Sequence, residues 1–168
     1  MILNLTEVTS GKLSKIPFSY RFIPEIEEKN NFGIIAISEF DINGEVSKHG
    51  STMAIDFTVK GEINYECARC LVSVSQIYEK QLHKTIIRTA PVDSEDEDWY
   101  LSEDHLFNLD QVVVDEIVMD LPYQVLCSKE CKGLCPNCGV NLNHETCACK
   151  DDKIDPRLEI LKNFFTQE

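Results

Sequence analysis

The sequence predicts an α+β fold in which an antiparallel β-sheet, or a partial barrel, is covered by one helix and followed by a cysteine-rich segment. Three observations predict it. Apolar and polar residues alternate over much of 1–90, apolar residues recur every four positions in 108–121, and cysteines crowd 127–149. Alternation is typical of strands that bury one face, and recurrence at helical spacing is typical of an amphipathic helix. A chain of 168 residues suits one modest core with a small appendage.

The clearest strand signal begins at Met53. Every second residue from there to Cys67 is apolar, with Gly61 as the exception, and from Asp56 onward polar residues lie between them. Glycine inside a strand often marks a bulge or a bend, and we expect one at Gly61. A second alternating run covers 72–88, so the two runs are predicted to form a hairpin joined by residues 67–71.

Residues 93–104 contain seven acids and no base. Such a run is typical of a solvated loop, and we expect one here between the hairpin and the helix. Trp99 and Tyr100 are unusual in a loop of this kind. They are candidates to anchor it to the core or to a partner.

The helix is predicted over 108–121. Asn108 is placed to cap its first turn, Gln111 to complete a capping box, and Pro122 to end it. Its apolar stripe repeats every four residues, at Leu109, Val113, Ile117 and Leu121. The acids of this helix are expected on its solvent-exposed polar face, which favours a structural over a catalytic interpretation; they are Asp110, Asp115, Glu116 and Asp120.

The chain is therefore predicted to have two parts. Residues 1–122 form a β-rich core domain that includes the acidic loop 93–104 and the helix 108–121. Residues 123–168 form a cysteine-rich segment that ends in a short helix at 158–165. The second part contains too few apolar residues to make a core of its own.

The cysteines of this second part have the spacing of a metal site. Cys135 and Cys138 are separated by two residues, which lets both sulfurs reach one ion if the chain turns tightly between them. Pro136 favours that turn. With Cys147 and Cys149 the pattern C-x2-C-x8-C-x-C predicts a four-thiolate zinc site that stabilises the C-terminal segment. Free or redox-active thiols are the alternative.

Four further cysteines are candidates for a second zinc site. Cys67 and Cys70 lie in the hairpin connection, and Cys127 and Cys131 follow the helix. If the helix packs on the sheet, the two pairs can meet. Nothing in the sequence fixes the distance between them, so two alternatives stay open. One is a single site that takes Cys127 or Cys131 as a ligand, and the other is a hairpin turn with one buried thiol.

Charge and cysteine content limit the class of protein. Lys plus Arg number 16 and Asp plus Glu number 29, for a net charge of −13. This balance argues against gripping nucleic acid over the whole surface and favours docking to a basic partner, such as a ribosomal protein. Residues 1–13 carry no secretory signal, and no apolar run is long enough for a membrane span. We expect a cytoplasmic protein with reduced thiols and no membrane partner.

One small basic grouping stands out in the hairpin region. It consists of Arg69, Lys80, Lys84 and Arg88, which are candidates for contact with RNA or a partner. The last three share strand parity with Leu82, however, so the same parity directs them toward the core. No phosphate loop, dinucleotide fingerprint or nucleophile motif occurs, and no small-molecule substrate is expected.

Several stretches together resemble a known family. They are residues 61–71 with their C-x-R-C-L motif, 114–122, 131–139 with G-L-C-P-x-C-G, 141–143 and 155–157. In combination they resemble the YceD-like family, the large ribosomal RNA subunit accumulation proteins of bacteria and plastids.

The resemblance implies a non-enzymatic factor for accumulation, processing or assembly of large-subunit ribosomal RNA. Its partner would be an RNA precursor or a basic ribosomal protein. It implies that Cys67 and Cys70 form a first motif and that the cysteines of 127–149 form a second, with no catalytic residue. Two other classes remain as rivals. They are a thiol-based redox or zinc-responsive regulator and a nuclease.

Overall fold

The computed structural model describes residues 1–27, 29–50, 52–87, 99–101 and 105–149. Three expectations lie outside this part of the chain: Arg88, most of the acidic loop 93–104, and the short helix at 158–165.

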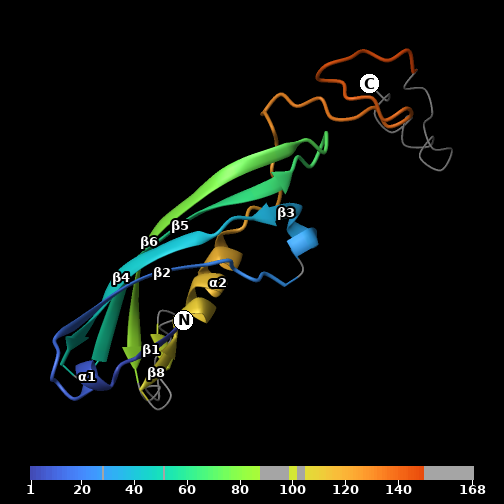
Figure 1. Cartoon of the computed structure of the whole chain (residues 1–168). Helices are drawn as coiled ribbons and strands as arrows, with labels where there is room; N and C mark the ends of the chain where they lie inside the picture. Colours follow the sequence, from blue (N-terminus) through green and yellow to red (C-terminus); the bar gives the residue numbers. More distant parts are fainter. Residues whose placement is uncertain (28, 51, 88–98, 102–104, 150–168) are drawn as a thin grey trace, which may run out of the picture.

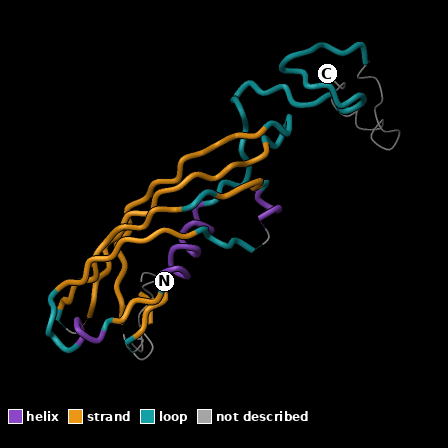
Figure 2. The backbone as a smooth tube through the Cα atoms, in the orientation of Figure 1, coloured by secondary structure: helices purple, strands orange, loops and turns teal. Residues whose placement is uncertain are grey.

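The fold is mostly antiparallel β-sheet with one long helix, as the sequence predicts (Figures 1 and 2). The main sheet has the order β2-β4-β5-β6-β7, and β3 pairs with β5 beyond the end of β4. All pairs are antiparallel except β6 with β7. The strands are β2 (Lys15–Phe22), β3 (Ile34–Ile37), β4 (Phe40–His49), β5 (Thr52–Glu66), β6 (Ser73–Ile87) and β7 (Trp99–Leu101).

Smaller elements lie at both ends of the sheet (Figure 1). Strands β1 (Ile2–Asn4) and β8 (Leu106–Asn108) form a separate two-stranded sheet, and β8 leads directly into the helix α2 (Leu109–Asp120). A one-turn helix α1 (Thr6–Thr9) follows β1, and the 3-10 turn η1 (Lys29–Phe32) precedes β3.

The predicted hairpin is confirmed. Strands β5 and β6 each have 15 residues, so each is about 50 Å long. The core face of β5 is fully apolar, and its side chains Ile55, Phe57 and Val59 are buried. Figure 1 shows that the connecting end of this hairpin points toward the cysteine segment, in orange and red. The length of the hairpin therefore brings residues 67–70 to that segment.

Gly61 has a packing role, and the bulge expected there does not occur in the pairing of β5 with β6. The register of β5 with β6 runs from Met53 opposite Ile86 to Glu66 opposite Ser73 without a shift, so no bulge occurs at Gly61 in this pairing. A Cβ atom at Gly61 would lie 2.3 Å from Cδ2 of Phe40, whose ring is fully buried. Gly61 is required because the Phe40 ring occupies the space of a side chain.

The helix covers the sheet with its apolar stripe. Leu109, Val112, Val113 and Ile117 are buried in the main core. The expected capping box is absent: Asn108 makes no side-chain capping hydrogen bond, and Gln111 donates to Asp115 at 2.8 Å. The helix still ends at the residues that precede Pro122.

A strand lies where only a loop was expected. Residues Trp99–Leu101 form β7, which pairs in parallel with residues 85–87 of β6. The two aromatic residues of the acidic run are thus tied to the sheet through the backbone, which fits the anchoring role expected of them.

We predict that Gly61→Ala destabilises the protein by about 1–3 kcal/mol, because the added methyl group overpacks the core against Phe40. Chemical denaturation measures the loss. The double variant Gly61→Ala with Phe40→Leu should recover part of it, since the smaller side chain vacates the contact. If Gly61→Ala lowers the free energy of unfolding as much in the Phe40→Leu background as in the wild type, this role of the ring would be contradicted.

Candidate metal centres

The first cysteine group joins the hairpin to the segment after α2. Cys67 and Cys70 lie in the connection between β5 and β6, and Cys127 and Cys131 follow the helix. Their four Sγ atoms lie within 4.8 Å of one another. The Sγ atoms of Cys67 and Cys131 are 3.8 Å apart, and those of Cys70 and Cys127 are 3.5 Å apart. All four thiols are buried except Cys127.

The second group lies entirely within the C-terminal segment. It consists of Cys135, Cys138, Cys147 and Cys149, whose Sγ atoms also lie within 4.8 Å of one another. It is more open than the first group, because only Cys135 is buried and Cys138 and Cys149 are exposed. Cys127 and Cys131 belong to the first group and not to this one.

Both groups contain the same tight turn. The N–H of Leu71 donates to the carbonyl of Cys67 at 3.0 Å, and the N–H of Gly139 donates to the carbonyl of Cys135 at 2.9 Å. Leu71 and Gly139 have φ values of 59° and 75°. A left-handed leucine is costly and is kept only where the surroundings impose it. The turn at 67–71 is therefore held by its contacts rather than by local preference.

Backbone hydrogen bonds fix the segment after α2 to the hairpin tip. Ala68 donates its N–H to the carbonyl of Val125 at 2.8 Å, and Leu134 donates to the carbonyl of Arg69 at 3.0 Å. The Arg69 guanidinium donates to the carbonyl of Cys131 at 2.8 Å. Gly133, with φ of 77°, lies so close to this tip that an added Cβ would be 3.0 Å from the Arg69 carbonyl oxygen. Arg69, considered above for RNA contact, thus binds the cysteine segment.

N–H groups stabilise thiolates in both groups. Burial raises the pKa of Cys67, but the backbone N–H groups around it outweigh burial and bring the pKa to about 6. The N–H groups of Cys138 and Asn137 lower the pKa of Cys135 to about 6. The neighbouring thiol of Cys131 raises the pKa of Cys127. Each group therefore favours some thiolates while mutual repulsion opposes full ionisation, and a bound cation relieves that repulsion.

Asn143 supports the first group, and the sequence reasoning did not single it out as a site residue. Its amide Nδ2 donates to Cys131 Sγ at 3.4 Å, and its Oδ1 accepts from the N–H of Lys132 at 2.8 Å. A donor to a ligand sulfur orients the ligand and spreads its charge. The signal for this residue was the Asn-Leu-Asn stretch at 141–143, noted only as part of the family resemblance.

The lysines of the basic grouping face the helix. Lys84 Nζ lies 2.6 Å from Glu116, with side chains only 11% and 13% exposed, and Lys80 Nζ lies 2.7 Å from Asp120. Lys80 holds the pKa of the Asp120 carboxyl below its usual range. Two of the helix acids expected at the solvent face thus turn toward β6, because strand parity places the lysines on its core face. The expected solvent-facing position is wrong for Glu116, whose side chain is 13% exposed, whereas Asp120 remains exposed beside Lys80.

Comparison with known proteins identifies the family of this chain. A family model described as large ribosomal RNA subunit accumulation protein YceD matches residues 55–165, a range that includes all eight cysteines. The chain belongs to the YceD family. Members of this family are described by an effect on ribosomal RNA rather than by a reaction.

Individual relatives of this YceD-family chain are described as uncharacterized. The Bacillus subtilis protein YlbN is 29% identical over 94% of this chain and 93% of its own length. A Mycobacterium tuberculosis protein is 31% identical over 74% of this chain, and the match spans 62% of the mycobacterial protein. No solved structure matches this chain. Within the described ranges, no helix combines the length and the apolar character needed to span a membrane.

The geometry gives this YceD-family member a clear chemical capacity. Each cysteine group presents four sulfur ligands at one point, so each can hold a metal ion. An ion in the first group would connect the hairpin tip to the segment after α2. An ion in the second would close the loop 135–149 on itself.

Two glycines with nearly equal φ values give a matched test of the packing at the first group. We predict that Gly133→Ala destabilises the cysteine segment more than Gly139→Ala, by about 1 kcal/mol. Both variants carry the cost of positive φ, but only at Gly133 does the new Cβ meet the Arg69 carbonyl, whereas Gly139 has nothing within 4 Å.

Hydrogen exchange of the amides in 127–149 measures the difference between the two variants. Equal protection in both would mean that contact with the hairpin tip does not hold this segment.

Proposed function

We propose that this protein is a non-enzymatic factor that supports accumulation, processing or assembly of large-subunit ribosomal RNA. In this proposal zinc fills both cysteine groups and gives the C-terminal segment a fixed shape for docking to an RNA precursor or a basic ribosomal protein. The description of the YceD family supports the RNA part, and the sulfur geometry supports the zinc part.

The single observation that carries the zinc proposal is the spacing of the sulfurs. A tetrahedral zinc with Zn–S bonds of about 2.3 Å separates its sulfurs by about 3.8 Å. The Cys67–Cys131 and Cys70–Cys127 separations are 3.8 and 3.5 Å. A disulfide would require about 2.05 Å. Four thiolates also complete the coordination shell, which is typical of structural zinc rather than of catalytic zinc with an open position.

The first site also explains how the predicted core domain 1–122 and the segment 123–168 would work as one unit. Its ligands come from both sides of that boundary, two from the hairpin tip and two from beyond the helix. The segment is then presented at a defined place relative to the sheet. The proposal includes a cytoplasmic location, because a reducing compartment keeps thiolate ligands available.

Contact through a basic protein fits the charge better than broad contact with RNA. The net charge is −13, and Lys80 and Lys84 are already paired with carboxylates of α2. Phosphate binding needs unpaired cations in a cluster. Arg69 and Arg88 remain the candidates for a localised contact with RNA or a partner, and Arg88 lies outside the described residues.

A zinc-responsive or thiol-based regulatory role is the second candidate. The exposure of Cys138 and Cys149 favours it, because exposed thiolates react with oxidants more readily than buried ones. This role predicts that mild oxidant releases zinc from the second site and changes activity while the first site stays filled.

Complementation tests the proposed function. In cells that lack this protein, the ratio of large- to small-subunit ribosomal RNA should fall, and the wild-type chain should restore it. Cys67→Ser with Cys70→Ser should fail to restore it and should reduce bound zinc from about two ions to about one per chain. Ser73→Ala with Ser75→Ala, which alters two outward-facing residues of β6, is the matched control and should restore the ratio. An unchanged ratio in the deletion strain would contradict the proposal.

A further inference from the structure

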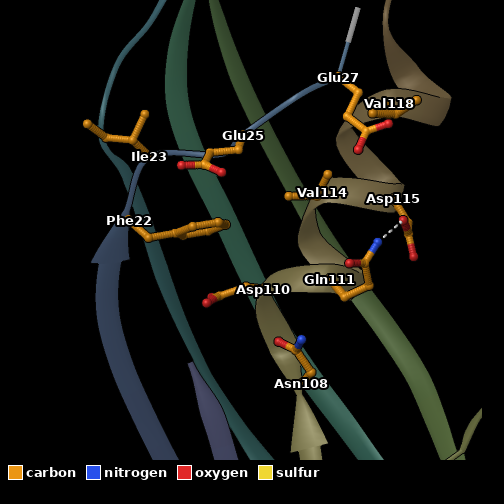
Figure 3. A pocket seen from close by; sticks show the side chains of 10 residues that line it. All are labelled: Phe22, Ile23, Glu25, Glu27, Asn108, Asp110, Gln111, Val114, Asp115 and Val118. Atoms are coloured by element: carbon orange, nitrogen blue, oxygen red, sulfur yellow. Dashed lines mark hydrogen bonds between the residues drawn. The ribbon is translucent and has the colours of Figure 1, made fainter.

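A groove separate from both cysteine groups lies between α2 and the segment that follows β2. Its volume is 680 Å³. Figure 3 shows the ring of Phe22 pointing from β2 toward the helix, with Val114 projecting from the opposite wall. Ile23 and Val118 complete the apolar part of the lining and are 60% and 37% exposed.

The rim of this groove is made of carboxylates. Glu25 and Glu27 come from the segment after β2, and Asp110 and Asp115 come from the helix (Figure 3). None of the described side chains that line the groove is Lys, Arg or His. The groove therefore combines exposed apolar surface with charge of one sign.

The local sequence explains why these acids point outward together. Along the extended segment, Pro24 and Ile26 are buried, while Ile23, Glu25 and Glu27 are exposed. Alternate residues of extended chain point to opposite sides, so burial of one set directs the other toward solvent and the groove.

Most of this charge has no ionic partner within the described part of the chain. Among the described residues, Glu25, Glu27 and Asp115 form no ion pair, and Asp115 accepts an amide hydrogen bond from Gln111 at 2.8 Å. Asp110 contacts the amino group of Met1 through one oxygen, while its other oxygen, Oδ1, is buried without a hydrogen-bond partner.

On the opposite flank of the same helix, the acidic side chains are paired with lysines. There Glu116 and Asp120 lie within 3.1 Å of Lys80, and Glu116 also lies 2.6 Å from Lys84. On the groove flank Asp110 contacts the Met1 amino group, and the neighbouring carboxylates Glu25, Glu27 and Asp115 form no ion pair with another described residue. Like charges placed together raise the free energy of the unliganded protein, and a cationic partner relieves that cost.

We propose that this groove docks a basic segment of a protein partner. Lys or Arg side chains of the segment meet the rim carboxylates, and one or two of its apolar side chains cover Ile23 and Val118. RNA phosphate carries charge of the same sign as the rim carboxylates and is therefore repelled from the groove. A second copy of this chain, itself at −13, lacks the net charge to match it.

The proposed preference for a cationic segment rests only on the charge and the exposed apolar surface of the groove. That the natural occupant is a basic ribosomal protein rests on the proposed function. The two can fail separately, because the groove can be probed with a synthetic peptide in the absence of ribosomal particles.

Fluorescence anisotropy with the full zinc-loaded chain tests the groove. The probe is a short labelled peptide of lysine and leucine, with glutamate–leucine and lysine–serine peptides for comparison. We expect saturable binding of the lysine–leucine peptide only. Glu25→Lys with Glu27→Lys should weaken it by at least about tenfold. The matched control, Glu7→Lys with Glu62→Lys, changes net charge equally at exposed sites outside the groove and should bind like wild type.

Ile23→Ser separates the apolar contribution from the charge. It removes exposed apolar surface without altering charge, and it should weaken the lysine–leucine peptide several-fold. Equal weakening by the groove and control charge reversals would overturn the proposal in favour of general electrostatic attraction. Binding that is absent, or self-association abolished by the groove variant, would also overturn it.

Discussion

The structure depends on one cross-connection, the meeting of four sulfurs from two distant parts of the chain. Cys67 and Cys70 lie at the tip of a hairpin, and Cys127 and Cys131 follow the helix that covers the sheet. Without an ion, mutual repulsion opposes ionisation of all four thiols and raises the pKa of Cys127, and backbone and side-chain hydrogen bonds join the two parts of the chain here. With an ion, the same sulfurs become the strongest contact between the sheet and the C-terminal segment. The long strands β5 and β6 are the arm that brings one half of the site to the other.

The two flanks of α2 differ in how their charges are paired. Lys80 and Lys84, on the core face of β6, form ion pairs with Asp120 and Glu116 of α2. On the other flank of α2, Asp110 and Asp115 line the groove together with Glu25 and Glu27 from the segment after β2. One helix thus stabilises the sheet on one side and leaves an acidic groove on the other. This asymmetry supports the proposal that the protein works through basic partners.

The parts of the fold with a strong periodic signal can be predicted from the sequence. The hairpin and α2 are examples, since their apolar residues repeat over ten or more positions. The second cysteine group lies within 15 residues, so the sequence spacing alone predicts it. The first group joins residues about 60 positions apart, and the sequence does not show that they lie close in the folded chain. The packing role of Gly61 could not be predicted from the sequence because its neighbour, Phe40, is distant along the chain. Likewise, the pairing of Lys84 with Glu116 follows from how α2 packs on β6, and the strand at 99–101 depends on a backbone pairing with β6 rather than on side-chain pattern.

X-ray absorption at the zinc edge of the native protein tests the central claim most directly. The account predicts two zinc ions per chain, each with four sulfur neighbours at about 2.3 Å and no nitrogen or oxygen ligand. The Cys67→Ser, Cys70→Ser variant should keep one such ion and lose protection of its 127–131 amides. A native protein without bound metal, or one whose metal is bound mainly by oxygen or nitrogen, would contradict the account.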